Sequence, residues 1–150
     1  MESAGLGLVK GPVAGLMVDS SVLVTAERGS VTTPEVIRNL RQAVGDVPIV
    51  ICALTVAELG HGIYHAGTEE KARHRRRFLD ELKQHVPIHP ITGATAEIIA
   101  RIGGSQAVKG ITVPFADLII GACALELGYA VATHNVRHFQ LIPGLDVRRI

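Results

Sequence analysis

Three acidic residues occupy positions where a carboxylate could bind a metal ion. Asp19 directly follows an apolar stretch at 15–18, Glu58 lies one turn into the helix expected after a second apolar run, and Asp117 opens an apolar helix. Oxygen ligands of this kind suit Mg²⁺ or Mn²⁺. A divalent ion held in this way lowers the pKa of a bound water and offsets the charge that builds on a phosphate during displacement. If the fold gathers the three acids, the chemistry they predict is phosphodiester hydrolysis.

Each of these acids also has a purely structural interpretation. Asp19 could cap a helix beginning at the next residue, and the segment 55–58 (TVAE) matches a capping box closed by Glu58. Asp117 could cap the helix that follows it. Three carboxylates gathered at one place, however, would repel one another by about 3 kcal/mol per pair at ~5 Å and an effective dielectric constant of ~20. A fold that gathers them must protonate them, pair them with bases or bind a divalent cation.

The elements that would position these acids alternate between strand and helix along the chain. Apolar segments predict strands at 15–18, 47–54, 85–91, 129–133 and 145–150, the third weakened by its prolines. Helical periodicity and capping residues predict helices at 20–27, 33–44, 55–66, 69–84, 94–102 and 117–127, with Gly103 and Gly104 ending the fifth. This alternation predicts an α/β domain with a mainly parallel five-stranded sheet flanked by helices.

The predicted topology brings at least two of the acids to one edge of the sheet. Open parallel sheets bind their ligands beyond the carboxyl ends of the strands. Asp19 and Glu58 follow the first and second strands, so they are expected at that edge. Asp117 reaches the same edge only if its helix runs antiparallel to the strands and the loop before it folds over.

Charge and composition restrict how the protein could bind a polyanion. The 150 residues carry a net charge of +1, and aromatic residues make up 3% with no Trp. Base stacking on an aromatic platform is therefore not expected, and a polyanion would have to meet a local basic patch. The densest candidate is the run at 71–77 (KARHRRR), which includes Arg75 and Arg76, although a solvated helix face with i,i+4 ion pairs is the alternative. Arg28 could face a phosphate or an acid of the site.

The cysteines and histidines do not form a recognisable metal motif in the sequence. Cys52 and Cys123 lie inside apolar runs, which predicts buried free thiols of a reducing compartment and a cytoplasmic location. No Cys and His occur at zinc-motif spacing. His61 and His65 are four residues apart but lack a third ligand in their helix, so a surface or packing role is expected.

The chain is predicted to be one domain with an N-terminal extension. Residues 1–16 are Gly-rich and are expected to be flexible, whereas residues 17–150 form the domain. No apolar run approaches the ~20 residues needed to span a bilayer. Apolar helix positions at Ile37, Leu40, Ile63 and Tyr64 exceed what one five-stranded sheet covers, which predicts a homodimer.

Four motifs, in this order along the chain, resemble those of the PIN-domain family, and more narrowly of VapC-type toxins: MVDSSVL, TVAELGHGI, FADLIIGACAL and VATHNVRHF. The similarity covers essentially all of residues 17–150. It implies a PIN-like three-layer fold and Mg²⁺- or Mn²⁺-dependent endoribonuclease activity on tRNA, rRNA or mRNA. It also implies inhibition by a cognate VapB-type antitoxin, with Asp19, Glu58 and Asp117 as the metal-binding acids.

The resemblance also assigns further positions near the metal. Ser21 matches a small hydroxyl or amide position of the family. Asn135 stands where the family usually has an acid, and it offers a carbonyl oxygen without charge. His138, at a position that is often Asp, could bind metal through nitrogen, steer a phosphate or pack beside Phe139.

Two other functions remain open at this point. One is an RNA-maturation nuclease that has no antitoxin. The other is a catalytically inert PIN-like binding module, since Asn135 removes one acid from the family pattern. A phosphatase with an aspartyl nucleophile is disfavoured, because the segment 19–21 (DSS) lacks a second Asp two residues after the first.

Overall fold

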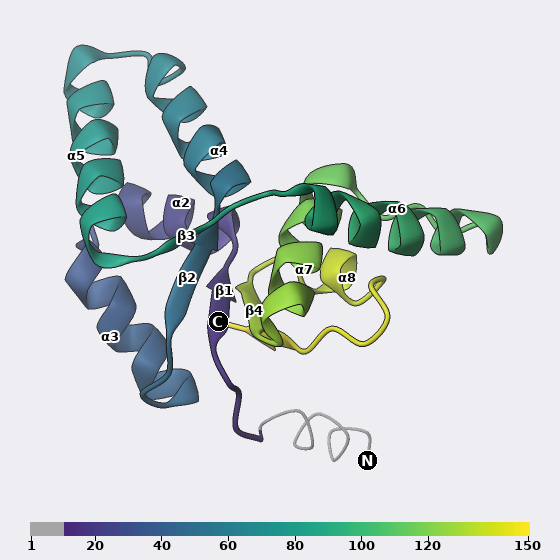
Figure 1. Cartoon of the computed structure of the whole chain (residues 1–150). Coiled ribbons are helices and arrows are strands. Elements are labelled where there is room, and N and C mark those ends of the chain that lie inside the picture. Colours follow the sequence, from purple (N-terminus) through teal and green to yellow (C-terminus); the bar gives the residue numbers. More distant parts are fainter. Residues whose placement is uncertain (1–10) are drawn as a thin grey trace.

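Five parallel strands form the centre of the structure, a computed structural model that describes residues 11–150 (Figure 1). In chain order they are β1 (Leu16–Val18), β2 (Ile49–Cys52), β3 (Ile88–His89), β4 (Ala130–Thr133) and β5 (Val147–Arg149). Their order in space is β3-β2-β1-β4-β5, and every neighbouring pair is parallel. The predicted five-stranded sheet is thus confirmed, with β1 at its centre.

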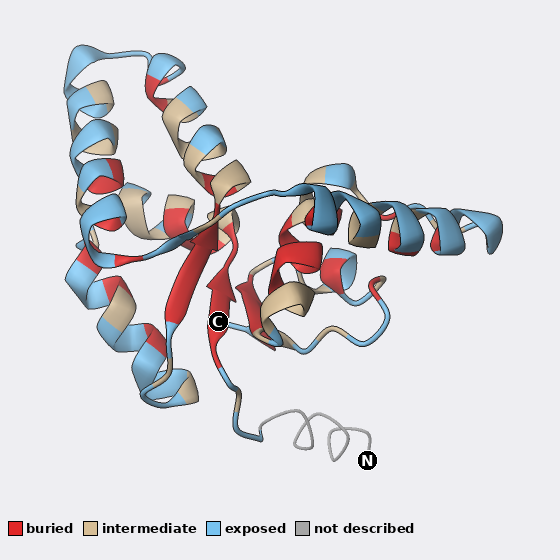
Figure 2. Cartoon of the chain, in the orientation of Figure 1, coloured by how far each residue is buried: buried red, intermediate tan, exposed pale blue. Residues whose placement is uncertain are grey.

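Helices cover both faces of this sheet and make a three-layer α/β fold (Figure 1). One face carries α2 (Ser20–Arg28), α3 (Thr33–Val44), α4 (Ala53–Tyr64) and α5 (Glu69–His85). The other carries α6 (Gly93–Val108), α7 (Phe115–Leu127) and α8 (Val136–Phe139). Figure 2 shows β1, β2 and β4 buried between the two helical layers, whereas the edge strand β3 is largely exposed.

The strands supply both halves of the core because successive side chains point to opposite faces of a sheet. Leu16 and Val18 of β1 pack with the α2–α5 layer, whereas Met17 packs with the α6–α8 layer. In β2 the side chains alternate in the same way: Ile51 packs with the α2–α5 layer and Cys52 with the α6–α8 layer. Burial on both faces explains why these strands are continuous apolar runs in the sequence.

The prediction that Gly103 and Gly104 end a helix is wrong. Helix α6 continues through both glycines to Val108. A Cβ on Gly103 would lie 2.9 Å from Leu118 Cδ2 of α7. The glycine therefore permits close packing of α6 on α7, and this contact offsets its low helix propensity of about 1 kcal/mol relative to Ala.

Some predicted boundaries shift by a few residues because other side chains cap the helices. Helix α3 spans the predicted residues, and Thr32 caps it in a capping box with Glu35. Strand β2 ends at Cys52, the N-cap residue of α4, so the predicted strand at 47–54 is shorter than expected. The short helix α8 was not predicted, because four residues are too few to show helical periodicity.

The predicted extension at 1–16 lies only partly within the described residues. Of these, Leu16 begins β1, and the carbonyl of Gly11 accepts a hydrogen bond of 2.7 Å from Arg148 Nη2. Gly15 passes so close to the ring of Tyr129 that a Cβ there would collide with it. Residues 11–16 thus contact the domain, and the rest of the predicted extension lies outside the described residues.

The apolar positions that motivated a homodimer are mostly core residues. Leu40 is 1% and Ile63 7% exposed, so neither contributes to a surface patch. Ile37 is half-buried, whereas Tyr64 is 81% exposed. Among the described residues, no helix has the combined length and apolarity required to cross a membrane.

Candidate active site at the carboxyl edge of the sheet

Asp19 sits at the carboxyl end of the central strand and is 2% exposed. Its backbone N–H donates to the carbonyl of Ala132 on β4 at 2.9 Å, which continues the strand pairing up to the acid. Asp19 Oδ2 accepts hydrogen bonds from Ser21 Oγ at 2.7 Å and from Thr133 Oγ1 at 2.8 Å. Two hydroxyl donors from two elements thus hold a buried carboxylate in one orientation.

A further set of hydrogen bonds ties this acid to the loop after β4. The Asn135 N–H donates to Thr133 Oγ1 at 2.8 Å, and the His134 N–H donates to Ser21 Oγ at 3.1 Å. The segment 133–135 is therefore fixed against the start of α2. This brings Ser21 and Asn135 to the same edge as Asp19, although the Asn135 side chain is exposed.

Glu58 projects from α4 with one oxygen unpaired. Burial raises the pKa of Glu58, the charges of Asp19 and Asp117 raise it further, and a hydrogen bond from Ser20 opposes them. Glu58 Oε1 is buried and has no hydrogen-bond partner among residues 11–150. Both aspartates therefore lie near enough to Glu58 for their charges to act on its carboxylate.

Asp117 lies in the first turn of α7, where the helix dipole favours a negative charge. Burial raises the pKa of Asp117, a hydrogen bond from His138 lowers it, and the charge of Asp19 adds to the rise. His138 Nδ1 and Asp117 Oδ2 are 2.8 Å apart, so α8 brings a histidine directly to the acid. Phe139, the neighbour of His138, is buried in the core and anchors α8 there.

Capping does not explain the three acids. Within the described residues the Asp19 side chain makes no capping hydrogen bond to α2. Helix α4 starts at Ala53 and is capped by Cys52, so the predicted capping box at 55–58 lies inside the helix. Pro114 is the N-cap of α7, which places Asp117 inside the helix as well.

The donor set at this edge fits a hard divalent cation. All three acids offer oxygen, and the unpaired Glu58 Oε1 is a buried acceptor that a cation would satisfy. Among the described residues, the oxygens of Asp19, Glu58 and Asp117 are not all within 4.8 Å of one another. An ion shared by the three would therefore keep water in its shell, as Mg²⁺ commonly does.

The three arginines expected near a phosphate have different surroundings. Arg28 ends α2 and is exposed. Arg75 is engaged within the fold: its Nη1 donates to the carbonyl of Gly62 at 2.7 Å, and its Nε lies 3.6 Å from Glu27 Oε1. Arg76, on the same helix, is exposed. Only Arg28 and Arg76 are thus free of these internal contacts.

Ser20 and Thr133 are supporting residues that were not predicted from the sequence. Ser20, at the start of α2, lowers the pKa of Glu58, and Thr133 donates to Asp19 from the end of β4. The available signal was a hydroxyl residue at the end of a buried strand or just after it, beside a carboxylate. His61 and His65 are exposed with ring centroids 4.6 Å apart, in agreement with the predicted surface role.

Comparison with known proteins gives consistent matches along most of the chain. Residues 16–144 match the PIN domain. Ribonuclease VapC of Rickettsia bellii is 31% identical over 133 residues, which cover 89% of this chain and 94% of the relative. VapBC2 of Rickettsia felis, solved bound to a DNA fragment from their promoter, has a chain that superposes with a TM-score of 0.75 at 20% identity, covering 89% of this chain and 97% of that one. VapBC-5 of Mycobacterium tuberculosis, described as a member of the VapBC family of toxin–antitoxin systems, gives a TM-score of 0.68 at 22% identity, covering 90% and 96%.

Proposed function

This chain belongs to the PIN-domain family, and from that premise we propose that it is a metal-dependent endoribonuclease, the toxin of a toxin–antitoxin pair. One observation carries the proposal: burial and the charge of Asp19, at the end of β1, raise the pKa values of Glu58 on α4 and Asp117 on α7, and one oxygen of Glu58 is buried without a partner in the described region. Such an arrangement is costly in a purely structural protein and useful in one that binds a cation.

Asp19, Glu58 and Asp117 would hold Mg²⁺ or Mn²⁺. When bound, the ion supplies an activated water and offsets charge on the phosphate. Asp19 acts from a fixed position, because Ser21 and Thr133 both donate to Oδ2. Glu58 and Asp117, which have raised pKa values, are more readily protonated without a cation, so cation binding releases protons from them.

His138 and Asn135 occupy the side of the site where the family pattern has acids. His138 Nδ1 donates to Asp117 Oδ2 and so orients that carboxylate. Asn135 is exposed beside Thr133, where its amide can hydrogen-bond a sugar or phosphate of the RNA without adding charge.

A trough next to Glu58, whose lining mixes basic residues with Glu27 and Glu70, is the proposed path of the RNA backbone. A cleft of about 80 Å³ is lined by Glu58, Arg28 and Arg75. It adjoins a wider depression of about 550 Å³ whose lining includes Arg28, Lys71, His74 and Arg75. Cations along such a groove bind the phosphates of a single strand.

Substitution of the free arginines should weaken RNA binding without changing the fold. In an Asp19→Asn background, which prevents cleavage, we expect Arg28→Gln, in the trough, to lower the affinity for single-stranded RNA. Arg76→Gln, on α5 outside the trough lining, tests whether RNA also follows that helix. Each lost phosphate contact should reduce the slope of log K against log salt by about 0.7. Arg41→Gln, an exposed arginine paired with Asp46 away from the trough, is the control. An unchanged salt slope for Arg76→Gln would show that this face of α5 is solvated and does not contact the RNA backbone.

The partner we propose is a VapB-type antitoxin in the cytoplasm, where both thiols stay reduced. The similarity to VapC and VapBC proteins supports it, and an antitoxin arginine could pair with the acids in place of the cation. We also propose a homodimer, to which the exposed Tyr64 can contribute. Light scattering after size exclusion, with the chain alone and with the product of the neighbouring upstream gene, tests both associations.

The decisive experiment is RNA cleavage by the purified chain. We expect cleavage in Mg²⁺ or Mn²⁺ that leaves 5′-phosphate and 3′-hydroxyl ends, loss of cleavage in EDTA, and a melting temperature that rises with divalent concentration. Silencing by the upstream product separates a toxin from an RNA-maturation nuclease. Binding of RNA without cleavage at any divalent concentration would identify an inert binding module and overturn the proposal.

A further inference from the structure

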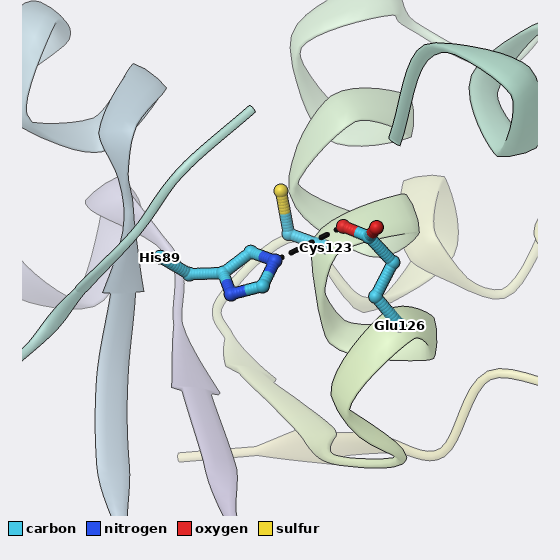
Figure 3. A group of neighbouring side chains, drawn as sticks. All are labelled: His89, Cys123 and Glu126. Carbon is cyan, nitrogen blue, oxygen red and sulfur yellow. Dashed lines mark hydrogen bonds and ion pairs between the residues drawn. The ribbon is translucent and has the colours of Figure 1, made fainter. Parts of the chain in front are cut away.

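A second cluster of ligand-type side chains lies between β3 and α7, apart from the carboxylate edge (Figure 3). His89 of β3 and Cys123 and Glu126 of α7 place one ligand atom each within 4.8 Å of the others. Figure 3 shows His89 and Glu126 pointing toward each other with Cys123 beside them, and His89 Nε2 lies 3.0 Å from Glu126 Oε1. It is the one such group in the part of the chain that the structure describes.

The burial of the cluster suits an enclosed site that can still be reached from solvent. Cys123 is fully buried. The side chains of His89 and Glu126 are 18% and 17% exposed. A small cation could therefore enter past the imidazole and carboxylate and reach the sulfur behind them.

Two neighbours support the three ligand atoms. Thr95 Oγ1, at the start of α6, donates to Glu126 Oε1 at 2.7 Å and so orients the carboxylate. Cys52, the residue of β2 that pairs in register with His89, places its Sγ 3.4 Å from Cys123 Sγ. Residues that orient ligands in this way are typical of metal sites, where their loss costs about 10–100-fold in affinity.

We propose that His89, Cys123 and Glu126 form a structural Zn²⁺ site. Nitrogen, sulfur and one carboxylate oxygen make a borderline-soft donor set that suits zinc, whereas the oxygen-only edge suits Mg²⁺ or Mn²⁺. Ion binding takes the thiol proton of Cys123 to solvent and replaces the hydrogen bond between His89 and Glu126 by two coordination bonds. A water molecule completes four-coordination.

The position of the cluster explains what such an ion would stabilise. Strand β3 has two residues and pairs only with β2 in the described sheet. Zinc bound to His89 would anchor this edge strand to α7. The same helix carries Asp117, six residues or about 9 Å before Cys123. The ion would thereby hold the helix that delivers one acid to the nuclease edge.

The test uses the full chain, reduced and stripped of metal, and measures metal and not RNA cleavage. Co²⁺ should bind with a thiolate-to-metal charge-transfer band in the near ultraviolet, and Zn²⁺ should displace it at one ion per chain. Zn²⁺ should also raise the melting temperature. Competition with a chromophoric chelator gives the affinity for Zn²⁺ alone.

Matched variants decide whether these three residues bind the ion. His89→Gln and Glu126→Gln, both at partly exposed positions, should each weaken Zn²⁺ binding about 100-fold or more, since a ligand is lost and not only its support. Cys123→Ala should remove the charge-transfer band. His65→Gln and Glu97→Gln, at exposed positions, and Asp19→Asn, at the other site, should leave Zn²⁺ affinity unchanged.

Three results would overturn the proposal. One is Co²⁺ binding without the charge-transfer band. Another is unchanged Zn²⁺ affinity in both His89→Gln and Glu126→Gln, which would make their contact a plain ion pair. The third is a Cys52–Cys123 disulfide, seen by mass spectrometry in the reduced preparation, which would withdraw the sulfur from coordination. None of these results bears on the nuclease, so the two proposals can fail separately.

Discussion

Asp19→Asn should abolish RNA cleavage while leaving the fold intact. The carboxylate lies at the end of the central strand, and its amide replacement can still accept hydrogen bonds from Ser21 and Thr133 while it loses the charge. A bound ion stabilises the transition state by several kcal/mol. Losing that stabilisation should slow cleavage about a thousandfold or more. Single-turnover cleavage of a defined RNA, with a melting curve for each preparation, measures both effects.

Asp46→Asn is the matched control for this substitution. Asp46 precedes β2, so it lies toward the opposite end of the sheet, and its side chain is 98% exposed. We expect cleavage and melting temperature to stay unchanged. Full activity of Asp19→Asn would refute the proposed site. An unfolded Asp19→Asn protein would show that Asp19 is required for folding and not specifically for cleavage.

Glu58→Gln should have two effects of opposite sign: loss of cleavage and a gain in the stability of the metal-free protein. The substitution removes a buried charge that two other acids oppose. Gln keeps a polar oxygen at this place, so the gain comes from the lost charge repulsion alone: at neutral pH we expect ~1 kcal/mol, or about 2–4 °C in melting temperature. Denaturant unfolding in EDTA measures the gain, and cleavage assays measure the loss.

The pH dependence of this gain follows from the raised pKa of Glu58. A raised native pKa means that the folded protein binds the proton more tightly than the unfolded chain, whose value is about 4.5. Below that value both states are protonated, and wild type and Glu58→Gln should be equally stable. As the pH rises through the native pKa, the wild type loses stability and the variant does not. A Glu58→Gln protein that is less stable at every pH would indicate a structural role.

The sequence was sufficient to predict the sheet and two of the acids' positions. Asp19 and Glu58 follow buried strands, and parallel pairing places the ends of such strands together whatever their register. To predict the position of Asp117, the direction of α7 also had to be known. The short connection from α7 to β4 makes this helix antiparallel to the strand, so its first turn lies at the same edge of the sheet. These features depend on element type and order, which periodicity reports well.

Contacts between distant elements could not be predicted in the same way. His138 reaches Asp117 only because α8 packs through Phe139, and Cys123 meets His89 only through the register of β2 and β3. Gly103 shows the same difficulty, because its role is set by Leu118 of another helix. Spacing along the chain describes neighbours within one helix or strand and carries no information on how two elements dock.

The pairing of β1 with β4 has a consequence for synthesis of the chain. Asp19 is made early, yet the hydroxyl of Thr133 that orients it comes 114 residues later. Ribosomes extend a chain from its N-terminus at about 5–20 residues per second, and contacts of high sequence separation form late in folding. The nascent protein therefore has no assembled site until β4 has emerged and paired with β1. Cleavage by a nuclease built in this order therefore has to wait until most of the chain has been synthesised.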